Sequence, residues 1–503
     1  MSNSTSIITS TFIADTAFAT IAECIRRHAR ERPDAPALAD DERALSYAQL
    51  DALMDRAAAA LQRDGIAPGE AVALCAAPSA MQAALFLGAL RAGVVVAPLA
   101  PGSTPAALAR MRADAQARRL FTDDDDLQAW LAPQGATPAP VDIRPESPFN
   151  IIYSSGTTGE PKGIVQPHGM RWAHVKRGLP YGYGPGALTL LATPLYSNTT
   201  LVVFFPSLAF GGAVRLMGKF DARRYCEIAQ AQRATHTMLV PVQYQRLMTL
   251  PDFDTFDLGA FRMKFCTSAP FPAALKADVL ARWPGGLVEF YGMTEGGGTC
   301  ILEAHAHPHK LHTVGRPAPG TDMRLIDESG RELPAGATGA VGEVVGHSPG
   351  MMAGYHGRPE ATREAEWFDA LGKRFIRTGD IGRFDEDGFL TLLDRRKDMI
   401  ISGGFNIYPS DLEAALREHP AVADAAVVGV PSPEWGETPV AFVVRRGDVG
   451  AEALREWLNA RVGKTQRLAA LHLVDELPRS AIGKVLKREL KERAQTPTSS
   501  RSR

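Results

Sequence analysis

The chain has few cysteines, and none of them stands in a metal-binding or disulfide pattern. No C-x-x-C motif occurs in its 503 residues, and the five cysteines are scattered: Cys24, Cys75, Cys226, Cys266 and Cys300. This spacing argues against a zinc site and against a disulfide framework. It is typical of a protein kept in a reducing compartment, so we expect a cytoplasmic location.

A strong charge imbalance and a membrane-spanning run are also missing. The net charge is −1, which gives no electrostatic reason to expect nucleic acid or an anionic membrane as a partner. Residues 1–10 lack the basic and apolar regions of a signal peptide. Residues 71–101 are the most apolar stretch, but Arg91 and three prolines interrupt them. They predict a buried helix followed by a strand at 94–97, and no integral membrane segment.

The length and the residue pattern predict more than one domain. Hydrophobic residues make up 45% of the chain and charged residues 22%, as in ordinary globular proteins. A chain of 503 residues exceeds the size that one core usually serves. Helical patterns over 48–63 and 80–91 alternate with strand-like runs at 71–75, 188–192 and 237–240. This alternation predicts an α/β fold with layered parallel sheets, and no fixed-period repeat suggests a solenoid.

The pattern changes near residue 392. A helix is predicted over 410–418 and another over 452–462, with strands at 422–430, 440–445 and 471–474. These elements form a small α+β unit, which follows the charged stretch 394–398. We therefore predict a large N-terminal domain at 1–394, a hinge at 395–397 and a small, mobile C-terminal domain at 398–503. The polar residues 496–503 are expected to be disordered.

A loop rich in glycine and hydroxyl groups follows the strand-like residues 149–152. It reads Tyr153-Ser-Ser-Gly-Thr-Thr-Gly-Glu-Pro-Lys-Gly163. Glycines let the backbone approach a bulky anion, and N–H and O–H groups can donate to phosphate oxygens. The order of its last residues differs from a Walker A loop. The loop therefore predicts a phosphate ligand, with the candidate residues Ser154, Ser155, Gly156, Thr157, Thr158, Gly159 and Lys162.

This loop resembles the signature of the adenylate-forming superfamily, which includes acyl- and aryl-CoA synthetases, adenylation domains of peptide synthetases and luciferases. The similarity continues in the family's order over about residues 46–490. It implies an enzyme that joins a carboxylic acid to AMP, with ATP and Mg²⁺ as cofactors. In the CoA-ligase branch, which we favour, CoA then takes the acyl group.

Two further segments resemble the nucleotide-binding motifs of that family. The resemblance of residues 291–295 implies that Tyr291 and Gly292 lie near adenine, that Thr294 contacts the α-phosphate and that Glu295 helps to hold Mg²⁺. A carboxylate suits this hard cation. Residues 267–270 are similar to the loop beneath the adenine, although they are less rich in glycine than usual. They add Ser268, Ala269 and Pro270 to the candidate site.

Residues 377–380 resemble the family's ribose motif. The carboxylate of Asp380 can accept hydrogen bonds from two vicinal hydroxyls, which makes it a credible ribose ligand. Arg395 matches an arginine that contacts ribose and phosphate in the family, and Lys397 falls at the family's hinge position.

Two motifs in the small domain complete the resemblance. The turn at 402–407 resembles one that lines the pantetheine tunnel in CoA-forming members, which implies roles for Gly403, Gly404 and Phe405. Residues 478–484 resemble the motif that carries the adenylation lysine, here Lys484. This lysine would bridge the carboxylate and the α-phosphate of ATP. The family then rotates the small domain to clear the path of the thiol.

The acid pocket is expected around the segment after residue 193, where many CoA-forming relatives carry a histidine in place of Ser197. We predict a hydrophobic monocarboxylic acid, whether aromatic, alicyclic or medium-chain, because no basic residue stands in this segment. The predicted pocket residues are Tyr196, Ser197, Asn198, Phe204 and Gly296.

Alternatives stay open at this point. An enzyme that loads a separate carrier protein would need the same motifs, and so would a luciferase-like oxygenase. A non-catalytic interaction protein fits poorly with the joint presence of Glu295, Asp380, Arg395 and Lys484. The sequence determines neither the exact acid nor the oligomeric state, for which a homodimer is one alternative.

Overall fold

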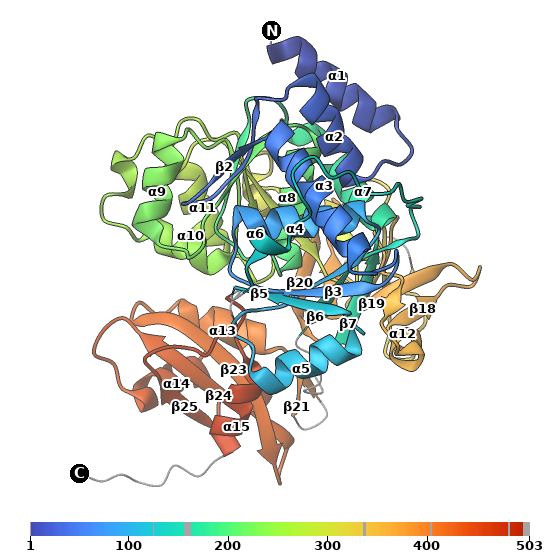
Figure 1. The fold of residues 1–503 in the computed structure, drawn as a ribbon. Helices are drawn as coiled ribbons and strands as arrows, with labels where there is room; N and C mark the ends of the chain where they lie inside the picture. Colours follow the sequence, from blue (N-terminus) through green and yellow to red (C-terminus); the bar gives the residue numbers. More distant parts are fainter. Residues whose placement is uncertain are drawn as a thin grey trace. The chain divides into compact units, whose positions relative to one another are not determined.

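The structure is a computed structural model that describes residues 2–123, 125–154, 162–334, 339–402, 405–480 and 483–495. The chain divides into two compact units. Unit 1 comprises Met1–Met323 and Val345–Arg377, and unit 2 comprises Arg324–Val344 and Thr378–Arg503. Both units mix helices with sheets (Figure 1), so the α/β prediction is confirmed.

The first sheet of unit 1 has nine strands in the order β14-β13-β12-β11-β10-β8-β9-β1-β2. Its central strands, from β12 to β1, run parallel, and β13, β14 and β2 are added antiparallel. The strands β8, β9, β10 and β11 are almost wholly buried, as expected of a parallel sheet. The strands are β1 (Pro36–Ala39), β2 (Ala44–Ser46), β8 (Leu188–Leu191), β9 (Ala213–Leu216), β10 (His236–Leu239), β11 (Met263–Cys266), β12 (Gly286–Gly292), β13 (Thr299–Glu303) and β14 (Arg316–Pro317).

The second sheet has the order β17-β7-β6-β4-β3-β5. The strands β5, β3, β4 and β6 are parallel, whereas β6 and β7 form an antiparallel hairpin to which β17 adds antiparallel. The predicted phosphate loop therefore connects two hairpin strands. The strands are β3 (Ala71–Cys75), β4 (Val95–Pro98), β5 (Arg119–Thr122), β6 (Pro148–Ser154), β7 (Lys162–Pro167) and β17 (Gly354–Tyr355).

Several helices of unit 1 begin at a side chain that accepts from a free N–H group. In α3 (Tyr47–Arg63), Ser46 accepts from the backbone of Gln49, whose side chain accepts in return from Ser46 N–H. The helix α4 (Ala80–Arg91) is buried over most of its length. A Cβ at Gly88 would lie 2.6 Å from Ala57 Cβ, so glycine permits the close packing of α3 against α4. The other helices are α1 (Ser2–Asp15), α2 (Ile21–Glu31), α5 (Pro105–Asp114), α6 (Leu127–Trp130), α7 (His168–Arg177), α8 (Asn198–Ala209), α9 (Ala222–Ala231), α10 (Pro241–Met248), α11 (Ala273–Arg282) and α12 (Pro359–Glu364).

Unit 2 contains a sheet in the order β22-β21-β24-β23, with β25 parallel to β24. Its apolar core includes Leu412, Leu416, Leu454 and Leu458, which follow one face of each helix at intervals of four residues. The elements are α13 (Pro409–Arg417), α14 (Ala451–Asn459), α15 (Lys487–Gln495), β21 (Ile400–Ser402), β22 (Phe405–Ile407), β23 (Val422–Ser432), β24 (Gly436–Arg445) and β25 (Ala470–Leu473).

A further sheet has the order β15-β16-β19-β18, with β20 paired to β19. It contains β15 (Asp322–Ile326), β16 (Gly342–His347), β18 (Glu366–Phe368), β19 (Arg374–Phe384) and β20 (Leu390–Arg395). The compact units thus divide earlier in the chain than the predicted hinge at 395–397. The two compact units are defined by how residues pack and not by which parts move. The hinge at 395–397 and the domain boundaries therefore stay predictions.

No helix in the described part of the chain is long and apolar enough to span a bilayer. The apolar stretch at 71–101 forms β3, α4 and β4, as its interruptions predicted. The predicted tail at 496–503 lies outside the described residues.

Candidate functional site

The predicted phosphate loop is held at both ends by the β6–β7 hairpin, in which Ser154 pairs with Lys162. Beside the first strand, the hydroxyl of Tyr153 donates to Asp114 Oδ2 at 2.8 Å. The loop's own candidates Ser155, Gly156, Thr157, Thr158 and Gly159 lie outside the described residues. What the structure establishes is therefore the frame of the loop.

The second nucleotide motif lies at the end of β12 and is joined to β7 by the segment around Tyr355. The backbone of Tyr355 pairs with Ile164 on β7, and its ring lies 5.1 Å from Lys162 Nζ. Its hydroxyl donates to Glu295 Oε1 at 2.8 Å. Lys162 and Glu295, from two motifs that are 133 positions apart, thus share one tyrosine.

Gly296 occupies a position that only glycine fits. Its φ is +72°, and a Cβ built on it would lie 1.8 Å from Gly350 O. The adjacent carbonyl of Glu295 accepts from Met352 N–H at 2.8 Å. These contacts fix the backbone from which the Glu295 side chain extends.

The predicted adenine loop follows β11 and carries a strained serine. Ser268 has φ +84°, a left-handed conformation that is unfavourable for residues other than glycine. Its hydroxyl is hydrogen-bonded to that of Thr199 at the start of α8. Thr267 Oγ1 donates to Phe290 O at 2.7 Å. The loop is therefore anchored to both α8 and β12, and Ala269 and Pro270 follow its anchored part.

The predicted acid-pocket segment forms the beginning of α8. Ser197 is its N-cap and accepts from Thr199 N–H at 3.3 Å. Tyr196 and Asn198 are partly exposed, whereas Phe204 is 1% exposed and packs in the core. Tyr196 and Asn198 are therefore accessible to a ligand, whereas Ser197 is buried and the burial of Phe204 favours a role in packing.

Arg171 on α7 is a residue that the sequence prediction missed. It is 1% exposed, and burial lowers the pKa of its guanidinium to about 9. It donates to the side-chain oxygens of Asn150, Gln166 and Asn198. The pocket segment itself contains no basic residue, but Arg171 reaches Asn198 from another helix. A basic residue between Met170 and Trp172 in an otherwise buried helix was the available signal.

In unit 2, the ribose motif and its predicted partner arginine form a pair. Asp380 on β19 faces Arg395 on β20, and Asp380 Oδ1 lies 3.3 Å from Arg395 Nε. Thr378 Oγ1 accepts from Asp380 N–H at 3.0 Å and donates to Val344 O at 2.8 Å. The carboxylate is therefore held by a fixed backbone and is oriented by one guanidinium.

Lys484 lies at the end of a tight turn. Ser480 N–H donates to Lys484 O at 2.8 Å, and Lys484 N–H donates to Ser480 Oγ at 3.2 Å. Gly483 has φ +77°, and its carbonyl accepts from Arg479 Nη1 at 2.6 Å. The turn thus fixes the point from which the lysine side chain extends.

The charges near Lys484 connect three motifs that are distant in sequence. Burial, together with repulsion from Arg395 and Lys397, lowers the Lys484 pKa to about 8, although Asp380 and Asp398 oppose the change. Burial also lowers the pKa of Lys397. Unit 2 therefore gathers cationic side chains around the Asp380 carboxylate, which is an arrangement suited to a phosphorylated ribose.

The predicted CoA turn is a hairpin formed by β21 and β22, in which Ser402 pairs with Phe405. Gly403 and Gly404 lie outside the described residues. Phe405 is 62% exposed, which is unusual for a large apolar side chain and leaves it available to a ligand.

Glu295 fits the predicted role of a Mg²⁺ ligand. No cluster of three or more His, Cys, Asp or Glu side chains in the described ranges could hold a metal by itself. Mg²⁺ at nucleotide sites usually needs only one or two carboxylates, because phosphate oxygens and water complete its shell. A single buried carboxylate on a fixed backbone meets that requirement.

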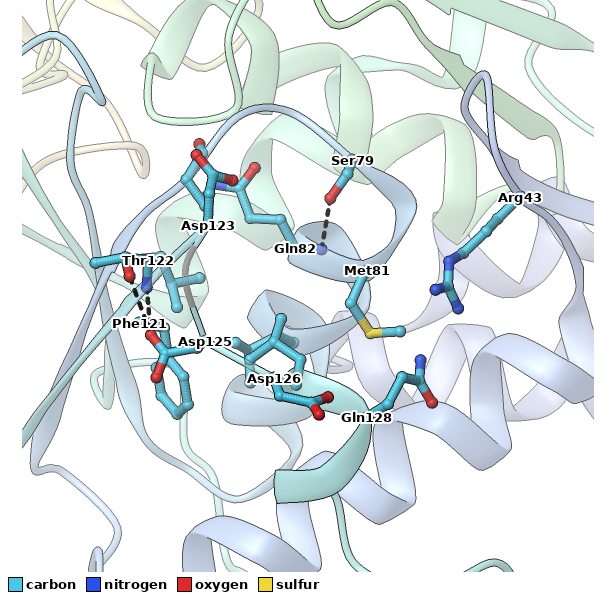
Figure 2. Close-up of a pocket in the computed structure, with 14 residues that line it drawn as sticks. Arg43, Ser79, Met81, Gln82, Phe121, Thr122, Asp123, Asp125, Asp126 and Gln128 are labelled. Carbon is cyan, nitrogen blue, oxygen red and sulfur yellow. Dashed lines mark hydrogen bonds between the residues drawn. The ribbon is translucent and has the colours of Figure 1, made fainter.

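A cavity of about 280 Å³ opens elsewhere in unit 1, between α4 and the residues after β5. Figure 2 shows Arg43, Met81 and Gln128 on one side of it and Asp123 and Thr122 on the other. None of the predicted site residues that the structure describes lines this cavity. Volume alone therefore does not identify the site that the motifs predict.

Comparison with known proteins identifies the family of the chain. The family model described as AMP-binding enzyme matches residues 25–356, and that of the AMP-binding enzyme C-terminal domain matches 411–484. A feruloyl-CoA synthase of Amycolatopsis sp is 34% identical over 93% of this chain and 97% of its own length. A fatty acid–[acyl-carrier-protein] ligase, ScoC of Streptomyces coeruleorubidus, is 32% identical over 94% of this chain and 96% of its own.

A solved structure agrees over nearly the whole chain. The crystal structure of ATP-bound MatB from Rhodopseudomonas palustris superposes with a TM-score of 0.83 and 29% identity. The match covers 94% of this chain and 99% of that one. Both parts of the family are thus present here in the family's order. The chain belongs to the AMP-binding enzyme family, in the acyl- and aryl-CoA synthetase branch of the adenylate-forming superfamily.

Proposed function

We propose that the chain is an ATP-dependent carboxylate–CoA ligase. The acid and ATP give acyl-AMP and pyrophosphate, and acyl-AMP and CoA then give acyl-CoA and AMP. The observation that carries this proposal is the grouping of Asp380, Arg395 and Lys484 in unit 2. Together they offer a ribose acceptor and two phosphate donors, as a nucleotide cleaved at its α-phosphate requires.

In the first half-reaction, a carboxylate oxygen attacks the α-phosphorus and pyrophosphate leaves. The task of the protein is positioning and charge neutralisation. Unit 1 supplies the hairpin loop with Lys162, and Thr294 donates to the α-phosphate. Glu295 would hold Mg²⁺ in part, and the bound ion would supply positive charge to the phosphates. Asp380 accepts from the ribose hydroxyls, and Lys484 neutralises charge on the reacting oxygens.

In the second half-reaction, the CoA thiolate attacks the acyl carbonyl and AMP leaves. Lys484 has no role in this step, so its withdrawal by a pivot at Lys397 frees the path. The hairpin of Gly403, Gly404 and Phe405 then lines the pantetheine path. Exposure of Phe405 supports this assignment, because its ring is available to the narrow thiol arm.

The proposed substrate is a hydrophobic monocarboxylic acid, and the proposed location is the cytoplasm. The feruloyl-CoA synthase supports an aromatic acid, and the buried, apolar α8 beside Ser197 supports an apolar pocket wall. All five cysteines are free and buried, as expected in a reducing compartment.

A pyrophosphate-release screen tests the proposal. Ferulate, cyclohexanecarboxylate, indole-3-acetate and decanoate would each be supplied with MgATP, with and without CoA. Release that needs one of these acids, together with a CoA thioester as product, is the expected result. Absence of release with every acid would contradict the proposal.

Transfer to a carrier protein is the second candidate, and the ligase ScoC is the observation that favours it. Acyl-AMP formed by the enzyme would be offered CoA and a phosphopantetheinylated carrier protein in parallel. If the acyl group is transferred faster to the carrier protein, then the carrier thiol and not CoA is the acceptor. The proposed adenylation step would be unchanged.

A further inference from the structure

Arg171 is a buried cation whose charge no carboxylate balances within the described ranges. Its guanidinium is 1% exposed and packs 5.6 Å from the Phe149 ring and 5.7 Å from the Phe205 ring. Its hydrogen-bond partners among the described residues are all neutral: Asn150, Gln166, Asn198 and His174. Burying an unpaired charge is costly, so its retention calls for an anion nearby.

This cation fixes the orientation of the Asn198 amide. Arg171 Nη1 donates to Asn198 at 2.8 Å, and Gln166 Nε2 lies 3.5 Å from the same atom. A guanidinium can only donate, so the atom that faces it is Oδ1. The Nδ2 group must therefore point away from Arg171. Asn198 is partly exposed, and no described residue accepts from its Nδ2.

The same network places Asn198 next to the second nucleotide motif. Gln166 accepts from Arg171 and donates through Nε2 to Thr294 O at 2.6 Å. Asn198 and Thr294 are thus both within hydrogen-bond reach of one buried amide. Thr294 belongs to the motif assigned to the α-phosphate, so Asn198 lies where the reacting carboxylate must come.

We propose that Asn198 Nδ2 donates a hydrogen bond to the carboxylate of the acid substrate, and that Arg171 is the positioning residue that orients this amide. The inference rests on the proposed function. Arg171 polarises the Asn198 amide, and this amide donates to the substrate carboxylate. The carboxylate is then the anion that offsets the charge of Arg171, although the two groups do not touch. Because the contact is with the reacting group, it serves every acid that the enzyme accepts.

Asn198→Asp is the sharpest test. An aspartate keeps an oxygen towards Arg171 but replaces the Nδ2 donor by a second acceptor with negative charge. We expect the KM for the acid to rise about 10-fold or more, since a charge-assisted hydrogen bond becomes a repulsion. The KM for ATP should stay within about twofold. Gln245→Glu makes the same chemical change at an exposed position of α10 and serves as the matched control.

Arg171→Met tests the positioning role, because methionine matches the stem of arginine but donates nothing. It should raise the KM for the acid, and adding Asn198→Leu should raise it little further, since both changes remove one interaction. Arg171→Lys, which keeps a cation, should recover part of the loss. Gln166→Leu removes the contact with Thr294 and should affect kcat more than the KM for the acid.

The outcomes separate this inference from the proposed function. An active enzyme in which Asn198→Asp and Gln245→Glu have the same KM for ferulate and cinnamate would overturn it. A loss confined to ferulate would also overturn it, because Asn198 would then bind a ring substituent. If the wild type releases no pyrophosphate with any acid, the proposed function fails. Even then, the thermal midpoint of unfolding tests whether the charge of Arg171 is unbalanced. Asn198→Asp places a negative charge beside Arg171 and should raise the midpoint. A lower midpoint would contradict the inference.

Discussion

Tyr355 donates its hydroxyl to Oε1 of Glu295 at 2.8 Å, although 60 positions separate the two residues. The same ring lies beside Lys162 at 5.1 Å. One side chain thus links the strand after the phosphate loop with the carboxylate proposed for Mg²⁺. Neither contact could be inferred from the motifs, since Tyr355 belongs to none of them.

Tyr355→Phe should weaken the use of MgATP while it preserves the aromatic contact with Lys162. The lost hydrogen bond leaves a buried carboxylate oxygen unpaired, a defect of about 1–3 kcal/mol. We expect the KM for MgATP to rise about 3- to 10-fold in pyrophosphate release, with a smaller change in the KM for the acid. Tyr244→Phe is the control, because its hydroxyl donates to Phe265 O at 2.9 Å in the core. Equal MgATP kinetics in the two variants would contradict the assigned link.

The Lys484 pKa predicts how adenylation depends on pH. Burial and the neighbouring Arg395 and Lys397 lower this pKa to about 8. The ammonium form is the one that can neutralise the reacting oxygens, so kcat/KM for ATP should decline as the pH rises through about 8. The measurement is pyrophosphate release from pH 6.5 to 9.5. Thioester formation from supplied acyl-AMP should lack this decline, and a decline shared by both steps would assign it to another group.

Three buried histidines predict a loss of stability in acid. Burial lowers the pKa values of His28, His168 and His236 to about 4, against about 6.5 in an unfolded chain. Between these values the unfolded chain binds protons that the folded chain does not bind. Stability is therefore complete above about pH 6.5 and falls as the pH is lowered towards 4, by roughly 2 kcal/mol per histidine at pH 5.

The thermal midpoint measured from pH 8 to 4.5 tests this linkage. His28 Nε2 lies 2.8 Å from Ala209 O, a contact that a glutamine amide can replace without titrating. His28→Gln should have a smaller fall in midpoint between pH 7 and pH 5 than the wild type. If the midpoint falls equally in His28→Gln and in the wild type, His28 does not contribute to the loss of stability in acid.

The local elements followed from the sequence because their residue periods are clear. The predicted strand at 71–75 and the helix at 80–91 agree with β3 and α4, and the predicted helix at 48–63 differs from α3 by one residue. In the last domain, the helix predicted to end at Val462 ends at Asn459. Helix ends depend on local caps, which periodicity does not predict.

The long-range contacts of the candidate site did not follow in the same way. The motifs assigned Asp380 and Arg395 to the ribose separately, and the structure adds that the two form an ion pair across adjacent strands. Arg171 belongs to no motif, and its contacts depend on how the fold brings Asn150 of β6 close to Asn198 at the start of α8. The interpretation of the pocket from the sequence considered only residues near Ser197, whereas Arg171 reaches Asn198 from another helix.

Lys484→Ala should separate the two half-reactions. In adenylation, the lysine neutralises charge that develops on the carboxylate and the α-phosphate, so its loss should lower the rate about 100- to 1,000-fold. In thioester formation from supplied acyl-AMP, no such charge forms near it, and the rate should stay within about threefold. Single-turnover assays of each step measure the two rates, and Lys219→Ala, at an exposed position of unit 1, is the control. An equal loss in both steps would rule out the proposed withdrawal of Lys484, because one fixed arrangement would then serve both reactions.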